Sequence, residues 1–281
     1  LRWEKEYKPA TRPKRVVVVG GGLAGCEAAR IAAQRGHKVS LLEQGKRLGG
    51  QLLIASKAPG RDSFEDQVYF EENEMKRTGV DVRLESRADI ATIKALKPDA
   101  VVIATGAVPR VPHDVSGLDQ PHVVYGWDVM QGKAQTGKRV AIVSQEDYYE
   151  TPGVADYLAS KGKEVTVFLK GAHIGKEIAR YSVGMTLARM ESLGVTTVPN
   201  VTLTKIDAKG LDFDSVFGGK TYRHEGFDTV VLVYGAVAQP NLYDQLKAEG
   251  SVAQLFLAGA AWLPRRMAEA TRHGAHIGLA I

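Results

Sequence analysis

Three glycines near the amino end of the chain are spaced for binding linked phosphates. They form the pattern G-x-G-x-x-G, which follows a run of β-branched residues and opens a stretch with helical spacing. The first glycine permits a tight turn, the second lets a pyrophosphate approach the backbone, and the third lets helix and strand pack closely. The helix N-terminus adds free N–H groups and partial positive charge. The predicted binding residues of this turn are Gly20, Gly22, Leu23, Ala24 and Gly25.

A carboxylate follows at the distance expected for a ribose contact. Glu43 ends the next predicted strand, 18 residues after Gly25, where the pattern calls for about 20. Its side chain can accept hydrogen bonds from ribose hydroxyls and would repel a 2′-phosphate. The glycine motif together with Glu43 therefore favours FAD, NAD or ADP over NADP. The alternative is a glycine-rich turn that binds no ligand, and it fits this context poorly.

Two further segments combine small residues with a polar side chain. Leu48-Gly49-Gly50-Gln51 comes five residues after Glu43, and Ala104-Thr105-Gly106 ends an apolar strand. Ligands in open α/β sheets lie beyond the carboxyl ends of the strands, so both segments can pass close to a cofactor. A plain turn remains the alternative for each.

Alternating strand and helix patterns would position these residues. Apolar runs predict strands at residues 15–19, 38–43, 80–84, 100–104, 139–143, 164–169, 201–206, 210–213, 229–233 and 255–258. Helical spacing predicts helices at residues 23–35, 64–77, 151–161, 181–193 and 265–280. Nearly continuous apolar strands indicate parallel sheets buried on both faces, so the predicted fold class is α/β.

The pattern restarts at Lys138, which indicates an internal repeat. The stretch VVVVGGGLAG…RGHKVSLLE matches VAIVSQEDYY…KGKEVTVFL. We expect two Rossmann-like dinucleotide-binding units, the second inserted into the first, with the strand after Gly250 completing the first sheet. The expected domains are a linker at 1–14, an FAD- or ADP-binding domain at 15–132 and 251–281, and an NAD(P)-binding-like domain at 133–250.

Composition excludes several classes of protein. Apolar residues are 44%, charged residues 25%, and no apolar run reaches the 18 residues of a membrane span. The single cysteine, Cys26, excludes a disulfide framework and an iron–sulfur cluster within this chain, and a buried filler is favoured over a reactive thiol. The net charge is +5 with basic and acidic residues interleaved, so we expect no nucleic-acid partner. We expect a cytoplasmic protein with no membrane contact and, because its seven histidines are scattered, no metal site.

The motifs, in this order, resemble the C-terminal region of a flavin oxidoreductase family that includes 2,4-dienoyl-CoA reductase, trimethylamine dehydrogenase and histamine dehydrogenase. The resemblance runs from about residue 13 and includes residues 227–235 and 257–274. It implies FAD, or ADP in its place, as the cofactor. It further implies an N-terminal TIM barrel with FMN and an iron–sulfur cluster, present only in a missing part or a partner chain. The resemblance adds to the expected cofactor-binding set Gln44, Gly50, Gln51, Ala88, Ala104, Thr105, Gly106, Gly259 and Ala260.

The chain departs from the family pattern at two places. In the second unit Ser144 and Glu146 replace the first two glycines, and Leu169 aligns with Glu43. Carboxylates in this turn would repel a pyrophosphate or cap the helix themselves, so we expect no productive NAD(P)H binding there. After the last strand, Ala260 stands where the family usually carries an aspartate, which removes a charge-assisted hydrogen bond worth about 1.5–3 kcal/mol.

The expected function is that of the nucleotide-binding part of a flavin-dependent oxidoreductase, amine dehydrogenase- or demethylase-like, that transfers electrons rather than oxidising NAD(P)H. No residue of the chain is a candidate proton-transfer catalyst. The expected partners are the FMN/iron–sulfur barrel and an electron-transfer protein, and we expect an oligomer. Two alternatives remain: a non-catalytic ADP-binding docking module, and an NADH-dependent flavin reductase.

Overall fold

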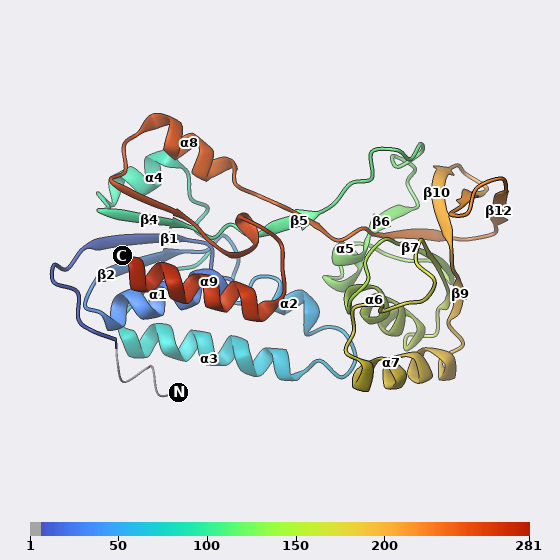
Figure 1. The fold of residues 1–281 in the computed structure, drawn as a ribbon, viewed down its shortest axis with the longest axis horizontal. Helices are drawn as coiled ribbons and strands as arrows, with labels where there is room; N and C mark the ends of the chain where they lie inside the picture. The colour runs from blue at the N-terminus through green and yellow to red at the C-terminus, as the bar shows by residue number, and fades with distance from the viewer. Residues whose placement is uncertain (1–6) are drawn as a thin grey trace. The chain divides into compact units, whose positions relative to one another are not determined.

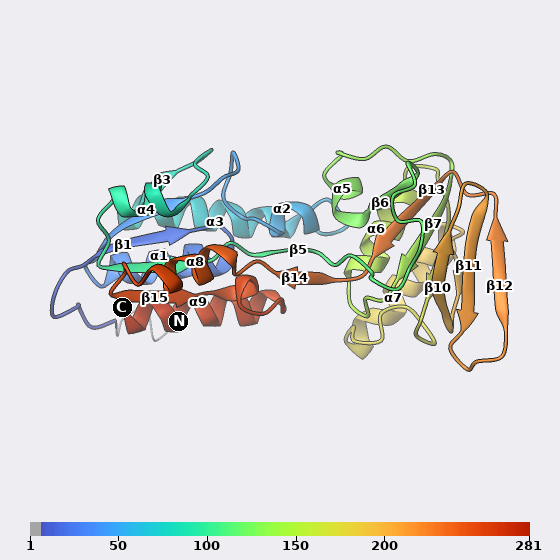
Figure 2. The same ribbon diagram turned by 90° about the horizontal axis from the view of Figure 1, so that it is seen from above.

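The computed structural model describes residues 7–281, which form two α/β units (Figure 1). Unit 1 consists of the described residues up to Leu53 together with Ser63–Val108 and Ala236–Ile281. Unit 2 consists of Ile54–Asp62 and Pro109–Gly235. Figure 2 shows the same two units from above.

Unit 1 is built on a five-stranded parallel sheet. Its strand order is β15-β4-β1-β2-β3. The strands are β1 (Arg15–Val19), β2 (Lys38–Leu42), β3 (Asp81–Arg83), β4 (Ala100–Ile103) and β15 (Gln254–Leu257). The late strand β15 pairs with β4 in parallel, so the end of the chain completes this sheet, as the sequence predicts.

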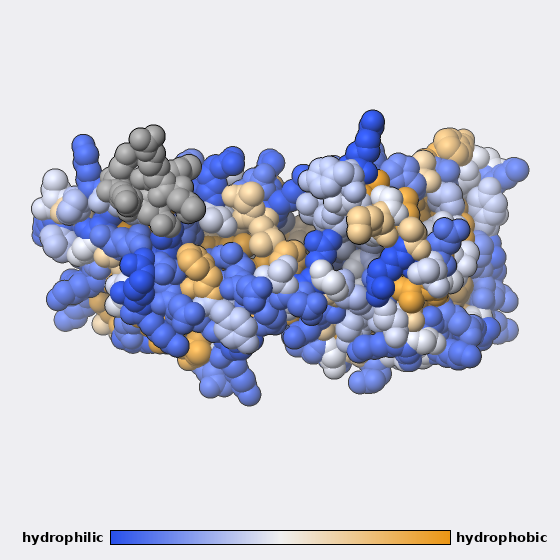
Figure 3. All heavy atoms as spheres, turned by 90° about the horizontal axis from the view of Figure 1, so that it is seen from below, coloured by the Kyte–Doolittle hydropathy of each residue, from blue (hydrophilic) through white to orange (hydrophobic). Residues whose placement is uncertain are grey.

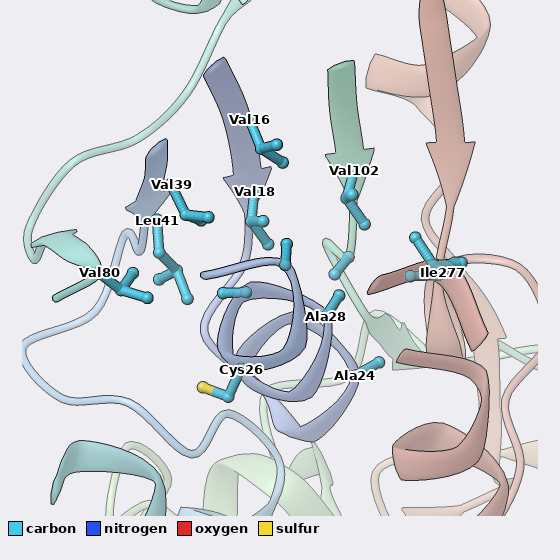
Figure 4. Packing of buried hydrophobic residues seen from close by; sticks show 14 of the residues in the cluster. Val16, Val18, Ala24, Cys26, Ala28, Val39, Leu41, Val80, Val102 and Ile277 are labelled. Carbon is cyan, nitrogen blue, oxygen red and sulfur yellow. The ribbon is translucent and has the colours of Figure 1, made fainter. Parts of the chain in front are cut away.

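Helices cover both faces of this sheet. They are α1 (Leu23–Gln34), α2 (Leu52–Ala55), α3 (Ser63–Thr78), α4 (Ile90–Ala95), α8 (Asn241–Glu249) and α9 (Met267–Ala280), with a 3₁₀ turn η2 (Gly259–Ala261). Successive strand side chains point to opposite faces. Val16 and Val18 therefore pack with α1 and α9 (Figure 4), whereas Val17 and Val19 pack on the face of α4 and α8.

Helices α1 and α9 pack closely because glycines line their contact. A Cβ at Gly274 would lie 2.3 Å from the carbonyl oxygen of Ala24, and one at Gly278 would lie 2.9 Å from that of Ala28. Contacts this short leave no room for a side chain. The close packing brings η2, which precedes α9, beside the first turn of α1.

Unit 2 has a second five-stranded parallel sheet with the order β6-β13-β7-β8-β9. Its strands are β6 (Val123–Tyr125), β7 (Arg139–Ser144), β8 (Glu164–Leu169), β9 (Thr196–Val198) and β13 (Thr229–Val233). One face is covered by α5 (Gly126–Met130), α6 (Glu150–Ala159) and α7 (Arg180–Ser192). The other is covered by an antiparallel sheet of β10 (Val201–Ile206), β11 (Gly210–Ser215) and β12 (Thr221–Glu225).

The boundaries of the two units differ from those expected. Residues 109–132 belong to unit 2, because β6 pairs with β13. Residues 236–250 belong to unit 1, because β14 (Ala236–Ala238) pairs with β5 (Ala107–Pro109) and Leu246 of α8 packs on the first sheet. Of the expected linker at 1–14, residues 1–6 lie outside the described residues, and residues 7–14 contain no helix or strand.

Candidate functional site

The glycines of the turn between β1 and α1 have two different structural roles. Gly20 has φ +106°, and a Cβ there would lie 2.2 Å from the carbonyl oxygen of Ala104. A Cβ at Gly25 would lie 1.9 Å from the carbonyl oxygen of Gly20, so the fold itself requires both glycines. Gly22 differs, because a Cβ there would meet nothing within 4 Å. The second glycine thus leaves open space at the N-terminus of α1, where a phosphate group fits.

Glu43 ties this turn to the end of β2. Its Oε2 accepts a hydrogen bond from the Gly21 amide at 2.7 Å, and its Oε1 accepts one from the Gly45 amide at 2.6 Å. A carboxylate oxygen can accept more than one hydrogen bond, so capacity remains for ribose hydroxyls. Glu43 therefore shapes the turn in addition to being available to a sugar.

The turn that contains Gly49 and Gly50 lies directly against the first turn. The Gly49 amide donates to the carbonyl of Gly21 at 2.8 Å, and a Cβ at Gly50 would lie 3.2 Å from the Cα of Gly22. Gly49 and Gly50 have φ +114° and +53°, which other residues adopt at a cost. Both turns thus present backbone rather than side chains around Gly22.

The segment after β4 closes another side of the site. Thr105 does not present a free hydroxyl, because its Oγ1 donates to the carbonyl of Gln239 at 2.7 Å. The Gln239 amide in turn donates to the carbonyl of Gly106 at 3.1 Å. A Cβ at Gly106 would lie 3.9 Å from Nε2 of Gln51, so the Gln51 amide reaches this segment.

The 3₁₀ turn η2 lies against the first turn of α1. Gly259 has φ +58°, and a Cβ there would lie 2.5 Å from the Cβ of Ala24. The Gly259 amide donates to Nδ1 of His273 at 3.2 Å. Burial, and then the charge of His276, lower the pKa of His273, which favours the neutral ring that can accept this bond. Ala260, the next residue, has no side chain that could hold a ligand hydroxyl or phosphate.

Unit 1 thus brings most of the expected site residues to one edge, the carboxyl ends of β1, β2, β4 and β15. Leu23 and Ala24 have buried side chains, so only their backbone faces a ligand, whereas Gln44 is exposed. Ala88 packs partly against the α4 and α8 face of the core, and its loop is tied to β2 where the Ser86 amide donates to the Glu43 carbonyl at 2.8 Å.

Three residues that shape the site are absent from the expected set: Gly21, Gln239 and His273. Gly21 adjoins expected positions, and the run of three glycines was the available signal. Gln239 and His273 contact the site from 134 and 14 residues away in sequence, and nothing local marks them.

Cys26 is a packed side chain and not a reactive thiol. It is fully buried, and its Sγ donates to the carbonyl of Gly21 at 3.3 Å. Burial, and then the charge of Glu71, raise its pKa well above the usual value, so the thiolate is not populated at neutral pH.

In unit 2 a side chain occupies the equivalent anion position. Oε1 of Glu146 accepts from the Tyr148 amide at 2.7 Å, and Oε2 accepts from the Thr151 amide at 3.1 Å. These N–H groups lie at the start of α6, where a pyrophosphate would otherwise bind. The structure thus bears out the expectation that an acid of this turn caps the helix. The acid that would bind a ribose is also missing from unit 2. In unit 1 Leu42, the residue before Glu43, pairs with Val19, and in unit 2 Phe168 pairs with Val143 in the same way. The residue after Phe168, which corresponds to Glu43, is Leu169.

Further groups crowd the start of α6. The Glu150 carboxyl group lies close to Glu146 and is hydrogen-bonded to the Trp127 side chain. Burial, and then the charge of Glu146, raise the pKa of Glu150 to about 7. The Arg61 guanidinium lies 3.8 Å from the centre of the Tyr149 ring. A crevice remains beside this turn, and its lining includes Glu146, Asp147, Lys170 and Lys176. A phosphate that enters it therefore meets two carboxylates as well as two lysines.

Comparison with known proteins identifies relatives of both halves of the sequence. The sequence model of the family "Pyridine nucleotide-disulphide oxidoreductase" matches residues 14–144, and that of "OYE-like second alpha/beta domain" matches residues 124–230. The N,N-dimethylglycine/sarcosine dehydrogenase of Chromohalobacter salexigens is 45% identical over 58% of this chain and 24% of its own length. The bilirubin reductase of Mediterraneibacter gnavus is 33% identical over 92% of this chain and 39% of its own length.

One solved structure connects the fold with the family named by the motifs. Histamine dehydrogenase from Rhizobium sp. 4-9 superposes with a TM-score of 0.89 at 25% identity, over 98% of this chain and 45% of that one. The chain belongs to the flavin oxidoreductase family of 2,4-dienoyl-CoA reductase, trimethylamine dehydrogenase and histamine dehydrogenase. It spans between about a quarter and a half of the length of these relatives.

No helix among residues 7–281 combines the length and the apolar character needed to cross a bilayer. In the same part of the chain, no group of three or more His, Cys, Asp or Glu side chains is arranged to hold a metal ion.

Proposed function

We propose that unit 1 binds an adenine nucleotide, FAD or ADP, at the N-terminus of α1. The observation that carries this proposal is the open space at Gly22, framed by two glycines that the fold requires and by the Glu43 carboxylate. The α1 N–H groups would hold the phosphates and Glu43 the ribose, while Gln51 and the segment after β4 would line the remainder of the nucleotide.

The chain is then the nucleotide-binding part of a flavin-dependent oxidoreductase related to amine dehydrogenases and demethylases. Two relatives whose names state oxidation of amines, the dimethylglycine/sarcosine and histamine dehydrogenases, support this. FAD, when bound, supplies electron transfer, and the chain positions it. The remaining length of the relatives is consistent with a TIM-barrel partner that carries FMN and an iron–sulfur cluster, and with an electron-transfer protein as acceptor.

Unit 2, in this proposal, does not take NADH or NADPH. Glu146 already satisfies the N–H groups that a pyrophosphate needs, and a second carboxylate, Asp147, follows it. Two like charges a few ångströms apart repel by about 1–4 kcal/mol, depending on the local dielectric. The NADH-dependent flavin reductase is therefore the least favoured alternative.

A non-catalytic ADP-binding module is the second candidate function, and Ala260 favours it. In related flavoproteins the aspartate that usually follows the last strand contacts the ribityl or pyrophosphate part of FAD, and the alanine at position 260 provides no such contact. The contacts at Gly22 and Glu43 concern only the ADP half. ADP could therefore occupy the site without a flavin.

Denaturing the purified protein and separating what it releases by chromatography tests the proposal. Yellow FAD supports the flavin reading, and colourless ADP supports the module. Release of neither, together with no binding of added FAD or ADP, contradicts both. Glu43→Gln should weaken retention of the nucleotide, whereas Glu85→Gln, an exposed matched control, should not.

Anaerobic mixing of the flavin-loaded protein with NADH or NADPH tests the claim about unit 2. We expect no rapid bleaching of the flavin absorbance at micromolar nucleotide. Fast reduction would overturn the assignment of unit 2 while leaving the nucleotide site of unit 1 intact.

A further inference from the structure

Helix α7 carries an exposed face without charge. Tyr181 and Met185 are 87% and 78% exposed, and because they are four residues apart they lie on one side of the helix. Gly184 and Ala188 are exposed on the same side. The opposite side of α7 packs against the rest of unit 2 with Val183, Thr186 and Met190, of which only Met190 is fully buried. Figure 1 shows α7 at the lower edge of unit 2, and Figure 3, drawn from below, shows hydrophobic atoms exposed among hydrophilic ones there. The core therefore does not account for these apolar side chains.

Opposite charges lie at the two ends of one flank of this face. Arg180 and Glu191 are 11 residues apart, which is three helical turns, or about 16 Å along the axis. Both are exposed, and among the residues that the structure describes neither side chain has an ion-pair partner. A flank that is positive at its start and negative at its end is complementary to itself when reversed.

We propose that the α7 face, defined as Tyr181, Gly184, Met185 and Ala188, binds the same face of a second copy of this chain. A two-fold axis near residues 185 and 186 runs the helices antiparallel, so Arg180 of each copy meets Glu191 of the other. Gly184 and Ala188 lie one turn apart and let the two backbones approach closely. Tyr181 and Met185 supply the apolar area that the contact removes from water.

The groove beside α7 extends this contact. It is lined by the second half of the helix and by the neighbouring edge of the sheet, including Leu187, Val195 and Thr196. One helix pair with such a margin buries less than the ~1,200 Å² of a standard stable interface. We therefore expect a dimer that forms reversibly as the concentration rises.

Charge exchange tests the antiparallel geometry directly. Sedimentation of the full chain across a hundredfold range of concentration should show dimers of the wild type. Arg180→Glu and Glu191→Arg should each weaken dimerisation at least tenfold, because each homodimer then holds two like-charged pairs. An equimolar mixture of the two variants should dimerise again, since both pairs of the mixed dimer are opposite in charge.

A second pair of variants separates the α7 face from general surface effects. Met185→Glu should abolish the dimer, whereas Leu279→Glu, which places the same charge at an exposed leucine of α9, should not. Both positions are exposed, so thermal melts should match that of the wild type. A wild type that stays monomeric overturns the proposal, and it does so even if the α7 face contacts a different protein. So does a dimer that neither Met185→Glu nor the charge exchange affects.

Discussion

At the scale of single residues, glycine serves two purposes in the turn after β1. Gly20 and Gly25 relieve contacts within the protein, where a Cβ would lie 2.2 and 1.9 Å from carbonyl oxygens. Gly22 relieves no contact within the protein, and its φ of −77° is open to any residue. Its lack of a side chain therefore has no explanation within the protein, and the nucleotide that we propose at this position would account for it.

This difference predicts opposite phenotypes for two substitutions. Gly22→Val should leave the melting temperature nearly unchanged and weaken FAD or ADP binding at least tenfold, because the side chain fills the phosphate space. Gly25→Ala should instead destabilise the protein by about 1–3 kcal/mol, the usual cost of overpacking. Calorimetric titration and urea unfolding measure the two effects, and equal losses of stability in both variants would contradict the division of roles.

Ala260 leads to a gain-of-function prediction. Ala260→Asp should restore one charge-assisted hydrogen bond, worth about 1.5–3 kcal/mol, and of the ribityl and pyrophosphate parts of FAD we expect the ribityl part to receive it. FAD affinity should then rise roughly tenfold or more, at about 1.4 kcal/mol per factor of ten, while ADP affinity stays the same or falls. Titration with each nucleotide measures the ratio, and an equal gain for both would show that residue 260 does not discriminate between them.

The residues of the site differ in how far the sequence predicts them. Gly20, Gly22, Gly25 and Glu43 are recognisable because their spacing is set within one strand-turn-helix-strand segment. The interactions of Gln239 with Thr105 and of His273 with Gly259 depend on tertiary packing, for which no local pattern exists.

At the scale of elements, helices α3 and α1 enclose a carboxyl group that costs stability. Glu71 of α3 is 1% exposed, its Oε1 accepts from Nε2 of Gln67 at 2.9 Å, and its Oε2 has no partner among the described residues. Burial raises the pKa of Glu71 from 4.5 to about 7. In the unfolded chain the group ionises near pH 4.5, so the folded state loses relative stability as the pH rises from 4.5 to 7.

Glu71→Gln should therefore change the pH profile in a defined direction. Near pH 5 the wild-type group is protonated in the folded state, and the variant should have nearly the same free energy of unfolding. At pH 8 the variant should be more stable by up to about 3 kcal/mol, because it cannot ionise. Urea unfolding at both pH values measures this, and an equal difference at pH 5 and pH 8 would exclude titration of Glu71 as the cause.

Helix α6 depends on an unusual cap. Glu146 reaches forward to the amides of Tyr148 and Thr151, so Glu146→Ala should destabilise unit 2 by about 1–2 kcal/mol. Asp147→Ala is the matched control, because the described contacts of Asp147 run through its backbone carbonyl, which accepts from the Glu177 amide at 2.9 Å. Chemical unfolding of the two variants measures the difference, and equal effects would mean that the cap contributes nothing specific.

Long strands were predicted well, and short elements were missed. Strands β1, β8, β10 and β13 coincide with the predicted residues, since each is an apolar or alternating run of five or six residues. Helices α2, α4 and α5 have only four to six residues, too short for helical spacing to be recognised. Helix α8 was also missed, and it carries mostly polar residues around the buried Leu246.

At the scale of the whole molecule, the internal sequence repeat and the order of the strand and helix patterns predicted two units with similar sheets. The boundaries of these units could not be predicted. Residues 123–125 and 236–238 are three-residue strands whose unit is set by the strand they pair with. The segment Ile54–Asp62 joins unit 2 although its neighbours on both sides belong to unit 1. Pairing across such distances becomes visible only in three dimensions.

If unit 1 binds the nucleotide and unit 2 does not, added ADP or FAD should slow hydrogen exchange in unit 1 only. ADP or FAD at a hundredfold excess over Kd should stabilise the state that binds it by about 2.7 kcal/mol, which slows amide exchange through unfolding of that state about a hundredfold. Hydrogen exchange should slow at residues 20–25 and 43–51 of unit 1. Residues 144–151 of unit 2 should exchange at an unchanged rate, because the carboxylate of Glu146 already holds the N–H groups there. Slower exchange at 144–151 with NADPH would place the working nucleotide site in unit 2 instead.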